Sequence, residues 1–324
     1  MVAPRDILLK ALREQSAGGV VRFDRFVDVA LFHPEAGYYI AHRDRVGRRR
    51  SADFTTAVAL GPLFGELVAS AAAGIVGDTR DHVLVEIGAE PGSSVFSGVA
   101  DRFAALTTLR VGDPLRIPPR AVVVANELLD AQPFRRFRFA DRRWVDLGVR
   151  VLADGSLAED VVGPPDDAEG RAFVAALPAP WHEGFTVDVA LRAESLLREI
   201  LTGAWTGAAI FLDYGKSVPE MLESSPQGTA RAYHRHTQHN DLLANLGEQD
   251  LTCHVAWDRL EMVMREAGFA PAKSERQEAF LVRHAASALE RIVASGTPEA
   301  VGVLKALTHP AHFGGKFQVL WGKR

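Results

Sequence analysis

The chain has 324 residues, of which 47% are hydrophobic and 24% charged, so it can form a sizeable buried core. Its formal net charge of -4 argues against a dedicated nucleic-acid binder or a protein that binds anionic membranes. The single cysteine, Cys253, excludes an intramolecular disulfide and a thiolate metal site within one chain, and this suits a reducing cytoplasm.

Residues 1–80 are predicted to form a mainly helical region. The apolar stretch 57–77 contains Pro62 and Glu66, so we expect a buried helix there and no membrane insertion. The basic run 45–50 is interpreted as a solvated loop. Apolar residues recur at helical spacing and predict helices over 6–12, 22–31 and 63–72.

Residues 81–324 alternate between strand and helix patterns. Residues 83–88 form a short apolar run that ends in glycine, which is typical of a buried parallel strand followed by a turn. Residues 134–151 alternate with period two and predict a hairpin, and the polar segment 216–255 is interpreted as an insertion. Further strands are expected at 108–111, 121–125, 208–212, 272–277 and 316–322, and helices at 93–103, 187–202 and 257–267.

This order predicts an α/β fold with a doubly wound, mostly parallel sheet. Strand 83–88 is expected at its centre, and an antiparallel strand over 317–321 at its end. In such sheets, ligands bind at the carboxyl ends of the strands. The residues that follow each apolar run are therefore the candidates for chemistry.

Several strings in this order resemble the MidA family, also described as the mitochondrial complex I assembly-factor methyltransferases. Early in the chain they are His33-Pro34-Glu35, Gly37-Tyr38-Tyr39, Asp53-Phe54-Thr55-Thr56 and Leu63-Phe64-Gly65-Glu66-Leu67. Later they include Val85-Glu86-Ile87-Gly88, Ala125-Asn126-Glu127, Asp130-Ala131, Asp213-Tyr214-Gly215, Asp250-Leu251-Thr252 and His254-Val255. The resemblance implies a class I Rossmann-like methyltransferase fold with an antiparallel last strand, S-adenosylmethionine as cofactor and a protein substrate. The mitochondrial relatives methylate an arginine.

A glycine-rich turn after the first strand lets the backbone approach the cofactor and directs helix amide groups at its carboxylate. Gly88 and Gly92 occupy the outer positions of that turn, and Glu90 stands where the family has a glycine. We expect Glu90 to weaken or abolish cofactor binding, because two nearby carboxylates repel each other. The predicted cofactor-binding residues are Asp53, Thr55, Glu86, Gly88, Gly92, Asp113 and Asn126.

The stretch between Gly92 and Asn126 is short for a class I core. It contains only about 30 residues, too few for the usual strands and helices, so we expect one strand and one helix to be missing. Asp113 is then the candidate for holding the ribose diol. The alternative for Asp113 is a loop carboxylate that faces water.

Methyl transfer to arginine is an in-line displacement, so the positioning of the substrate matters most. The guanidinium group stays protonated at neutral pH, and a carboxylate must orient it and help remove the proton. Glu127 and Asp130 follow a core strand and are candidates for this role, although an Asn126-Glu127 pair could instead cap a following helix. With Asp213, Tyr214 and His254 they form the predicted catalytic set.

Asp213 and Tyr214 end another core strand and are expected to line the same crevice as Glu127 and Asp130. His254 is interpreted either as a general base or as a structural hydrogen bonder.

Two further readings receive little support from the sequence. His234, His236 and His239 lie in a polar segment without acidic or cysteine neighbours, so we predict no metal site. The predicted hairpin mixes arginines with aromatic residues, as an RNA-binding strand can, but alternation also suits an edge hairpin with one buried face.

Two functions therefore remain. One is a cytoplasmic, S-adenosylmethionine-dependent protein methyltransferase. The other is a catalytically inactive methyltransferase-fold protein that binds a partner or assists assembly. The turn that contains Glu90 is the feature that separates them.

Overall fold

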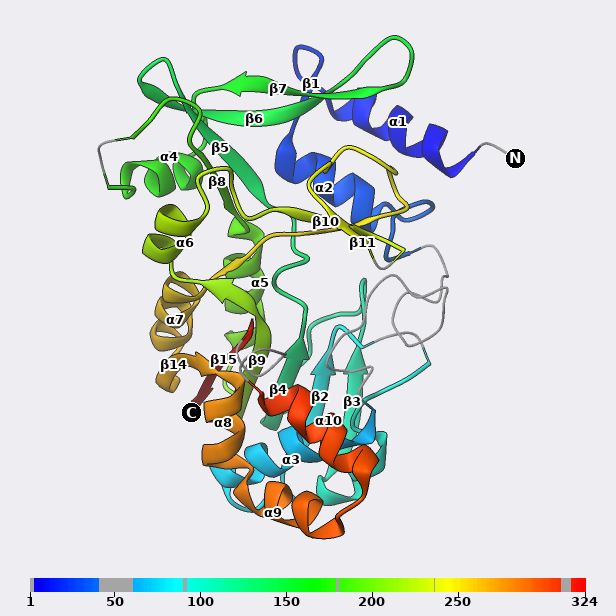
Figure 1. The fold of residues 1–324 in the computed structure, drawn as a ribbon, viewed down its shortest axis with the longest axis vertical. Helices are drawn as coiled ribbons and strands as arrows, with labels where there is room; N and C mark the ends of the chain where they lie inside the picture. The colour runs from blue at the N-terminus through cyan, green and yellow to red at the C-terminus, as the bar shows by residue number, and fades with distance from the viewer. Residues whose placement is uncertain (1–2, 41–60, 90–91, 179–180, 236, 310–315) are drawn as a thin grey trace. The chain divides into compact units, whose positions relative to one another are not determined.

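A computed structural model of the chain describes residues 3–40, 61–89, 92–178, 181–235, 237–309 and 316–324. The backbone contacts form two compact units (Figure 1). Unit 1 consists of Met1–Phe54, Asp130–Ala193 and Lys216–Ala256. Unit 2 consists of Thr55–Leu129, Glu194–Gly215 and Trp257–Arg324. The predicted boundary at residue 80 stays a prediction.

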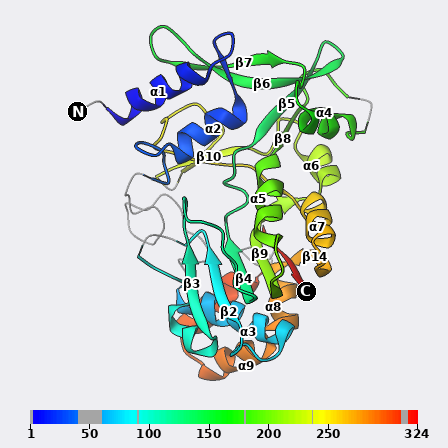
Figure 2. The ribbon, with the colours of Figure 1, turned by 180° about the vertical axis from the view of Figure 1, so that it is seen from behind.

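Unit 2 contains the predicted mostly parallel sheet. Its strands follow the order β14-β15-β9-β4-β2-β3, and Figure 2 shows β3, β2, β4 and β9 side by side. The strands are β2 (Val83–Ile87), β3 (Ala105–Leu109), β4 (Arg120–Asn126), β9 (Thr206–Lys216), β14 (Ala270–Arg276) and β15 (Phe317–Lys323). β3, β2, β4 and β9 run parallel, whereas β15 is antiparallel to β9 and to β14. The predicted fold class, with an antiparallel last strand, is confirmed.

The strand at 83–88 is not central, as we expected, but lies next to the edge strand β3. The reason is the short stretch that follows it. Residues 92–119 contain only the 3-10 helix η2 (Ser97–Arg102) and β3, so in the described part of the chain no further strand extends the sheet beyond β3. A full helix predicted over 93–103 is therefore wrong, and the missing strand and helix are confirmed.

Helices cover the sheet of unit 2 where its strands are apolar. Val122 and Val124 of β4 and Ile210 and Leu212 of β9 are fully buried. Alternate residues of a strand point to the same face, so these side chains lie together on one face of the sheet. They join one hydrophobic cluster with residues from α3, α8, α9 and α10. The helices of this unit include α3 (Pro62–Val76), α7 (Trp257–Glu266), α8 (Gln277–His284), α9 (Ala286–Ser295) and α10 (Pro298–Thr308), and α5 (Leu191–Leu201) leads into it.

Unit 1 contains an antiparallel sheet of five strands, in the order β1-β6-β5-β8 with β7 also paired to β6. Its strands are β1 (Val20–Arg22), β5 (Arg135–Ala140), β6 (Arg143–Val151), β7 (Leu157–Gly163) and β8 (Thr186–Val189). β5 and β6 form a hairpin whose turn residues, Asp141 and Arg142, have φ of 50° and 62°. Such a turn matches the twist of paired strands.

The remaining elements of unit 1 are helices and a small sheet. The helices are α1 (Pro4–Gln15), α2 (Phe23–Phe32), α4 (Ala168–Ala175) and α6 (Val218–Ser224). The second sheet has the order β11-β10-β12, with β10 (Arg231–His234), β11 (Thr237–His239) and β12 (Asp250–Thr252), and β13 (Val255–Ala256) follows. The helix predicted over 187–202 begins later, because 187–189 pair with β5 as part of β8.

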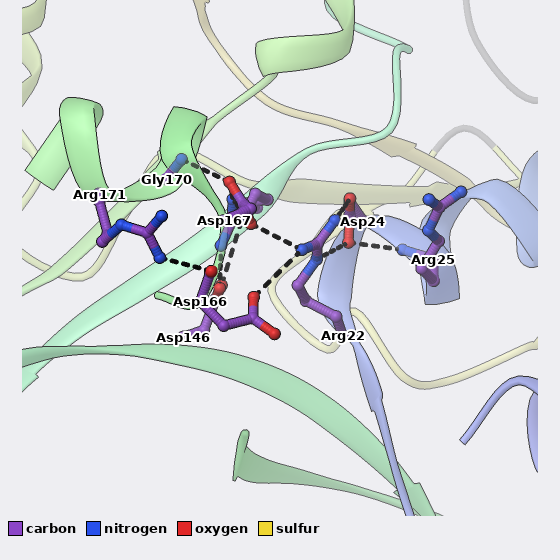
Figure 3. A network of polar contacts seen from close by, with 9 residues as sticks. Arg22, Asp24, Arg25, Asp146, Asp166, Asp167, Gly170 and Arg171 are labelled. Carbon is purple, nitrogen blue, oxygen red and sulfur yellow. Dashed lines mark hydrogen bonds and ion pairs between the residues drawn. The ribbon is translucent and has the colours of Figure 1, made fainter. Parts of the chain in front are cut away.

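The arginines of the β5 strand are neutralised within unit 1. Arg135 is only 3% exposed and forms ion pairs with Asp146 and Asp167. Figure 3 shows Asp167 between Gly170 and Arg22. The carboxylate of Asp167 accepts a hydrogen bond from the Gly170 amide at 2.7 Å and another from the Arg22 guanidinium at 2.9 Å. Arg136 and Arg138 share Glu159. These arginines therefore pair with carboxylates inside unit 1. The alternative of an edge hairpin is wrong in one respect, because β5 lies between β6 and β8 and is not an edge strand.

Candidate functional site

Polar side chains gather at the carboxyl ends of β2 and β4 in unit 2. Ile87 of β2 pairs with Leu109 of β3 and with Ala125 of β4, so the three strands end at one edge of the sheet. Glu86 and Asn126 are thereby brought to neighbouring strand ends. This is the edge at which open parallel sheets bind ligands.

Glu86 is a buried carboxyl group at the end of β2. The side chain is 8% exposed, and its Oε1 accepts a hydrogen bond from the Val95 amide at 3.3 Å. Its Oε2 is buried and has no hydrogen-bond partner within the described part of the chain. Burial raises the pKa of Glu86, although hydrogen bonds from Ser94 and Val95 and the charge of Arg110 act in the opposite direction. A buried acceptor of this kind favours a ligand that donates a hydrogen bond.

Asn126 provides a second buried acceptor at the same edge. Its Nδ2 donates to Oε1 of Glu127 at 2.9 Å. Its Oδ1 is buried and meets no donor among the described residues. The two acceptors fit a ligand with ammonium, hydroxyl or amino donors, and S-adenosylmethionine has groups of all three kinds.

The two outer positions of the predicted cofactor turn have a backbone conformation that favours glycine. Gly88 and Gly92 have φ of 83° and 74°, a region that residues with a side chain adopt reluctantly. A Cβ at Gly88 would also meet the Leu128 side chain at 3.2 Å. Glu90, Asp53 and Thr55 lie outside the described residues, and their predicted roles stay predictions.

Asp113 closes a turn after β3. Its Oδ2 accepts a hydrogen bond from the Arg110 amide at 2.8 Å, and its own amide donates to the Arg110 carbonyl at 3.0 Å. The side chain is exposed, as in the loop-carboxylate alternative. The ribose-binding role of Asp113 remains a prediction.

Glu127 lies directly after β4 with a φ of 51°, and its amide donates to the Leu212 carbonyl of β9 at 2.9 Å. Asp213 follows Leu212 and is only 1% exposed. Its Oδ2 accepts the Leu129 amide and its Oδ1 accepts the Tyr214 amide, each at 2.8 Å. Asp213 therefore fixes the turn that carries Glu127. Both residues directly follow the last parallel pair of β4 and β9, Asn126 with Leu212, although β9 itself continues to Lys216 and does not end at Asp213 and Tyr214 as predicted.

The alternative in which Asn126 and Glu127 cap a following helix is wrong. The next element after β4 is the strand β5, and residues 127–134 contain no helix. The carboxylate of Glu127 is thus not used as a helix cap. The catalytic role of Glu127 stays a prediction.

Asp130 belongs to unit 1, where its carbonyl accepts a hydrogen bond from the Cys253 amide at 3.0 Å. The charge of its carboxylate acts on Tyr39. The hydroxyl of Tyr39 donates a hydrogen bond to Oδ1 of Asp250 at 2.9 Å. Burial raises the pKa of Tyr39 well above its usual value, and the charges of Asp250 and Asp130 raise it further. Tyr39 and Asp250 were not among our candidates, although both occur in the strings that resemble the family.

His254 also belongs to unit 1, and its amide donates to Oγ1 of Thr229 at 3.2 Å. Its Nδ1 is buried and has no hydrogen-bond partner within the described part of the chain. Burial lowers the pKa of His254 to about 4, and the charges of Lys216 and Arg231 contribute. The imidazole is therefore neutral at pH 7, and its low pKa would make it a weak base.

The low pKa of His254 predicts a pH dependence of stability. The unfolded chain takes up a proton as the pH falls through about 6.5, whereas the folded chain does so only near pH 4. Stability is therefore full above pH 6.5 and is lost between pH 6.5 and 4. Urea unfolding at several pH values will show a loss over this window that is smaller in His254→Gln. An equal loss in both proteins would contradict the assignment.

No described helix is long and apolar enough to cross a membrane. Over the same residues, no group of three or more His, Cys, Asp or Glu side chains could hold a metal ion. His234 and His239 lie on neighbouring strands, β10 and β11.

Comparisons with known proteins show which family and which solved structures the chain resembles. Residues 109–274 match the family described as "Putative S-adenosyl-L-methionine-dependent methyltransferase". The chain is 26% identical to a COG1565 superfamily member from Burkholderia thailandensis whose crystal structure contains S-adenosyl-homocysteine, with a TM-score of 0.85 over 99% of this chain and 92% of that one. A native crystal structure of a COG1565 superfamily protein from the same organism matches with a TM-score of 0.82, at the same identity and coverage. No curated protein matches the chain.

Proposed function

The chain belongs to the MidA family of S-adenosyl-L-methionine-dependent methyltransferases, and on this premise we propose that it binds S-adenosylmethionine and transfers its methyl group to a protein. The observation that carries the proposal is a pair of buried acceptors at one sheet edge, Oε2 of Glu86 and Oδ1 of Asn126, which have no hydrogen-bond partner among the described residues. The relative with bound S-adenosyl-homocysteine supports the same cofactor.

The cofactor supplies an electrophilic methyl group on a sulfonium, and the residues of unit 2 would hold and orient it. Glu86 and Asn126 would accept hydrogen bonds from its donors, while the backbone at Gly88 would allow a close approach. Arginine is our proposed acceptor residue, and the cytoplasm our proposed compartment. A carboxylate such as Glu127 would bind the guanidinium and accept its proton.

Calorimetric titration with S-adenosylmethionine and S-adenosylhomocysteine tests the cofactor. We expect the unaltered chain to bind both, and Glu90→Gly to bind at least about tenfold more tightly, because a repelling carboxylate is removed. The absence of binding by either protein would favour the inactive assembly factor. Equal affinity in the two proteins would show that Glu90 does not face the cofactor.

Incubation with methyl-labelled S-adenosylmethionine and a cell extract, followed by complete hydrolysis of the labelled protein, tests the acceptor. Labelled methylarginine is the expected product. Label on another amino acid would overturn the choice of arginine and leave cofactor binding intact.

A further inference from the structure

Helix α3 makes an unusually close backbone approach through Gly65. A Cβ at this position would lie 2.1 Å from the Val95 carbonyl oxygen and 3.0 Å from the carbonyl carbon. Real Cβ atoms essentially never come so near another heavy atom. Any residue other than glycine would therefore displace either the helix or the segment at Val95.

The segment at Val95 forms part of the candidate cofactor site. The Val95 amide donates to Oε1 of Glu86, and Ser94 lies directly before Val95 in the chain. Oγ of Ser94 in turn accepts the Phe96 amide at 3.1 Å. This segment lies three residues after Gly92, where the predicted cofactor turn ends. A shift at Val95 would therefore move the hydrogen bonds that hold Glu86.

We propose that Gly65 is a positioning residue for cofactor binding, an inference that rests on the proposed function. It lets α3 support the 94–96 segment directly, backbone against backbone. That support holds the Val95 amide on Oε1 of Glu86 and leaves Oε2 available for the ligand. Gly65 itself touches no reacting group, and it acts through Val95.

The chain offers a matched control on the same helix. A Cβ at Gly74 would lie 2.5 Å from the His284 carbonyl oxygen of α8, which is again a backbone clash. Both glycines lie inside α3, so alanine improves the helix propensity similarly at each. The two substitutions differ in what they displace, because Gly74 contacts α8 and not the segment that binds Glu86.

The test compares Gly65→Ala and Gly74→Ala by calorimetric titration with S-adenosylhomocysteine, at 10 °C and with sucrose to favour the folded state. We expect Gly65→Ala to raise the Kd by about tenfold or more, and Gly74→Ala by less than about twofold. Thermal unfolding of both variants reports their general destabilisation separately. Hydrogen exchange at the Val95 amide should accelerate in Gly65→Ala alone.

Equal affinities of the two variants would overturn the positioning role, provided that the unaltered protein binds. If Gly65→Ala does not fold, exchange of the Val95 amide in the unaltered protein decides the question. Protection that rises with saturating S-adenosylhomocysteine supports the proposal, and free exchange in both states contradicts it. The absence of binding by the unaltered protein would instead refute the proposed function.

Discussion

Arg135→Met will lower the free energy of unfolding by about 3–5 kcal/mol. Arg135 is 3% exposed and its guanidinium pairs with Asp146, which is 1% exposed, and with Asp167. Methionine fills a similar volume but leaves a buried carboxylate without its cation. An uncompensated buried charge costs far more than the pair contributes. A Cβ at Gly170 would lie 2.4 Å from Nη1 of Arg135, so the guanidinium also packs tightly.

Urea unfolding monitored by circular dichroism will measure this loss. The control is Arg80→Met, which removes an ion pair to Asp78 whose side chains are 79% and 57% exposed. We expect no measurable change in this variant, because solvent screens exposed pairs. A second variant, Arg135→Met with Asp146→Leu, should recover part of the stability. An equal effect of Arg135→Met and Arg80→Met would show that the buried network contributes nothing.

Glu127→Gln will reduce the rate of methyl transfer by about 10² to 10⁴, the range typical of general acid–base catalysis. The amide keeps the shape of the side chain and can still accept the hydrogen bond from Asn126. It cannot accept the guanidinium proton or bind that cation electrostatically. The affinity for S-adenosylhomocysteine should change by less than about twofold, because the cofactor contacts are unaltered.

Incorporation of labelled methyl groups and calorimetry will separate these two effects. Asp101→Asn, at an exposed carboxylate on η2, is the matched control and should retain full activity. Full activity of Glu127→Gln would remove Glu127 from the catalytic set. A parallel loss of cofactor affinity would assign Glu127 to cofactor binding instead.

The sequence by itself determined the class of fold and the parallel strands of unit 2. Apolar runs such as 121–125 and 208–212 became buried parallel strands, because a strand covered on both faces is apolar throughout. The short stretch after Gly92 also predicted correctly that one strand and one helix of the usual class I core are missing. The strings that resemble the MidA family pointed to Glu86, Asn126, Glu127 and Asp213, which the parallel strands bring to one edge.

Only the tertiary structure decided which contacts these residues make. The Tyr39–Asp250 hydrogen bond joins residues 211 positions apart, and no local pattern predicts such a pairing. The requirement for glycine at position 65 arises from the carbonyl of Val95, in the turn that precedes η2. The strand at 187–189 forms because β5 provides a partner. Local periodicity reports how one segment is buried, whereas hydrogen bonds and close contacts depend on which other segment packs there.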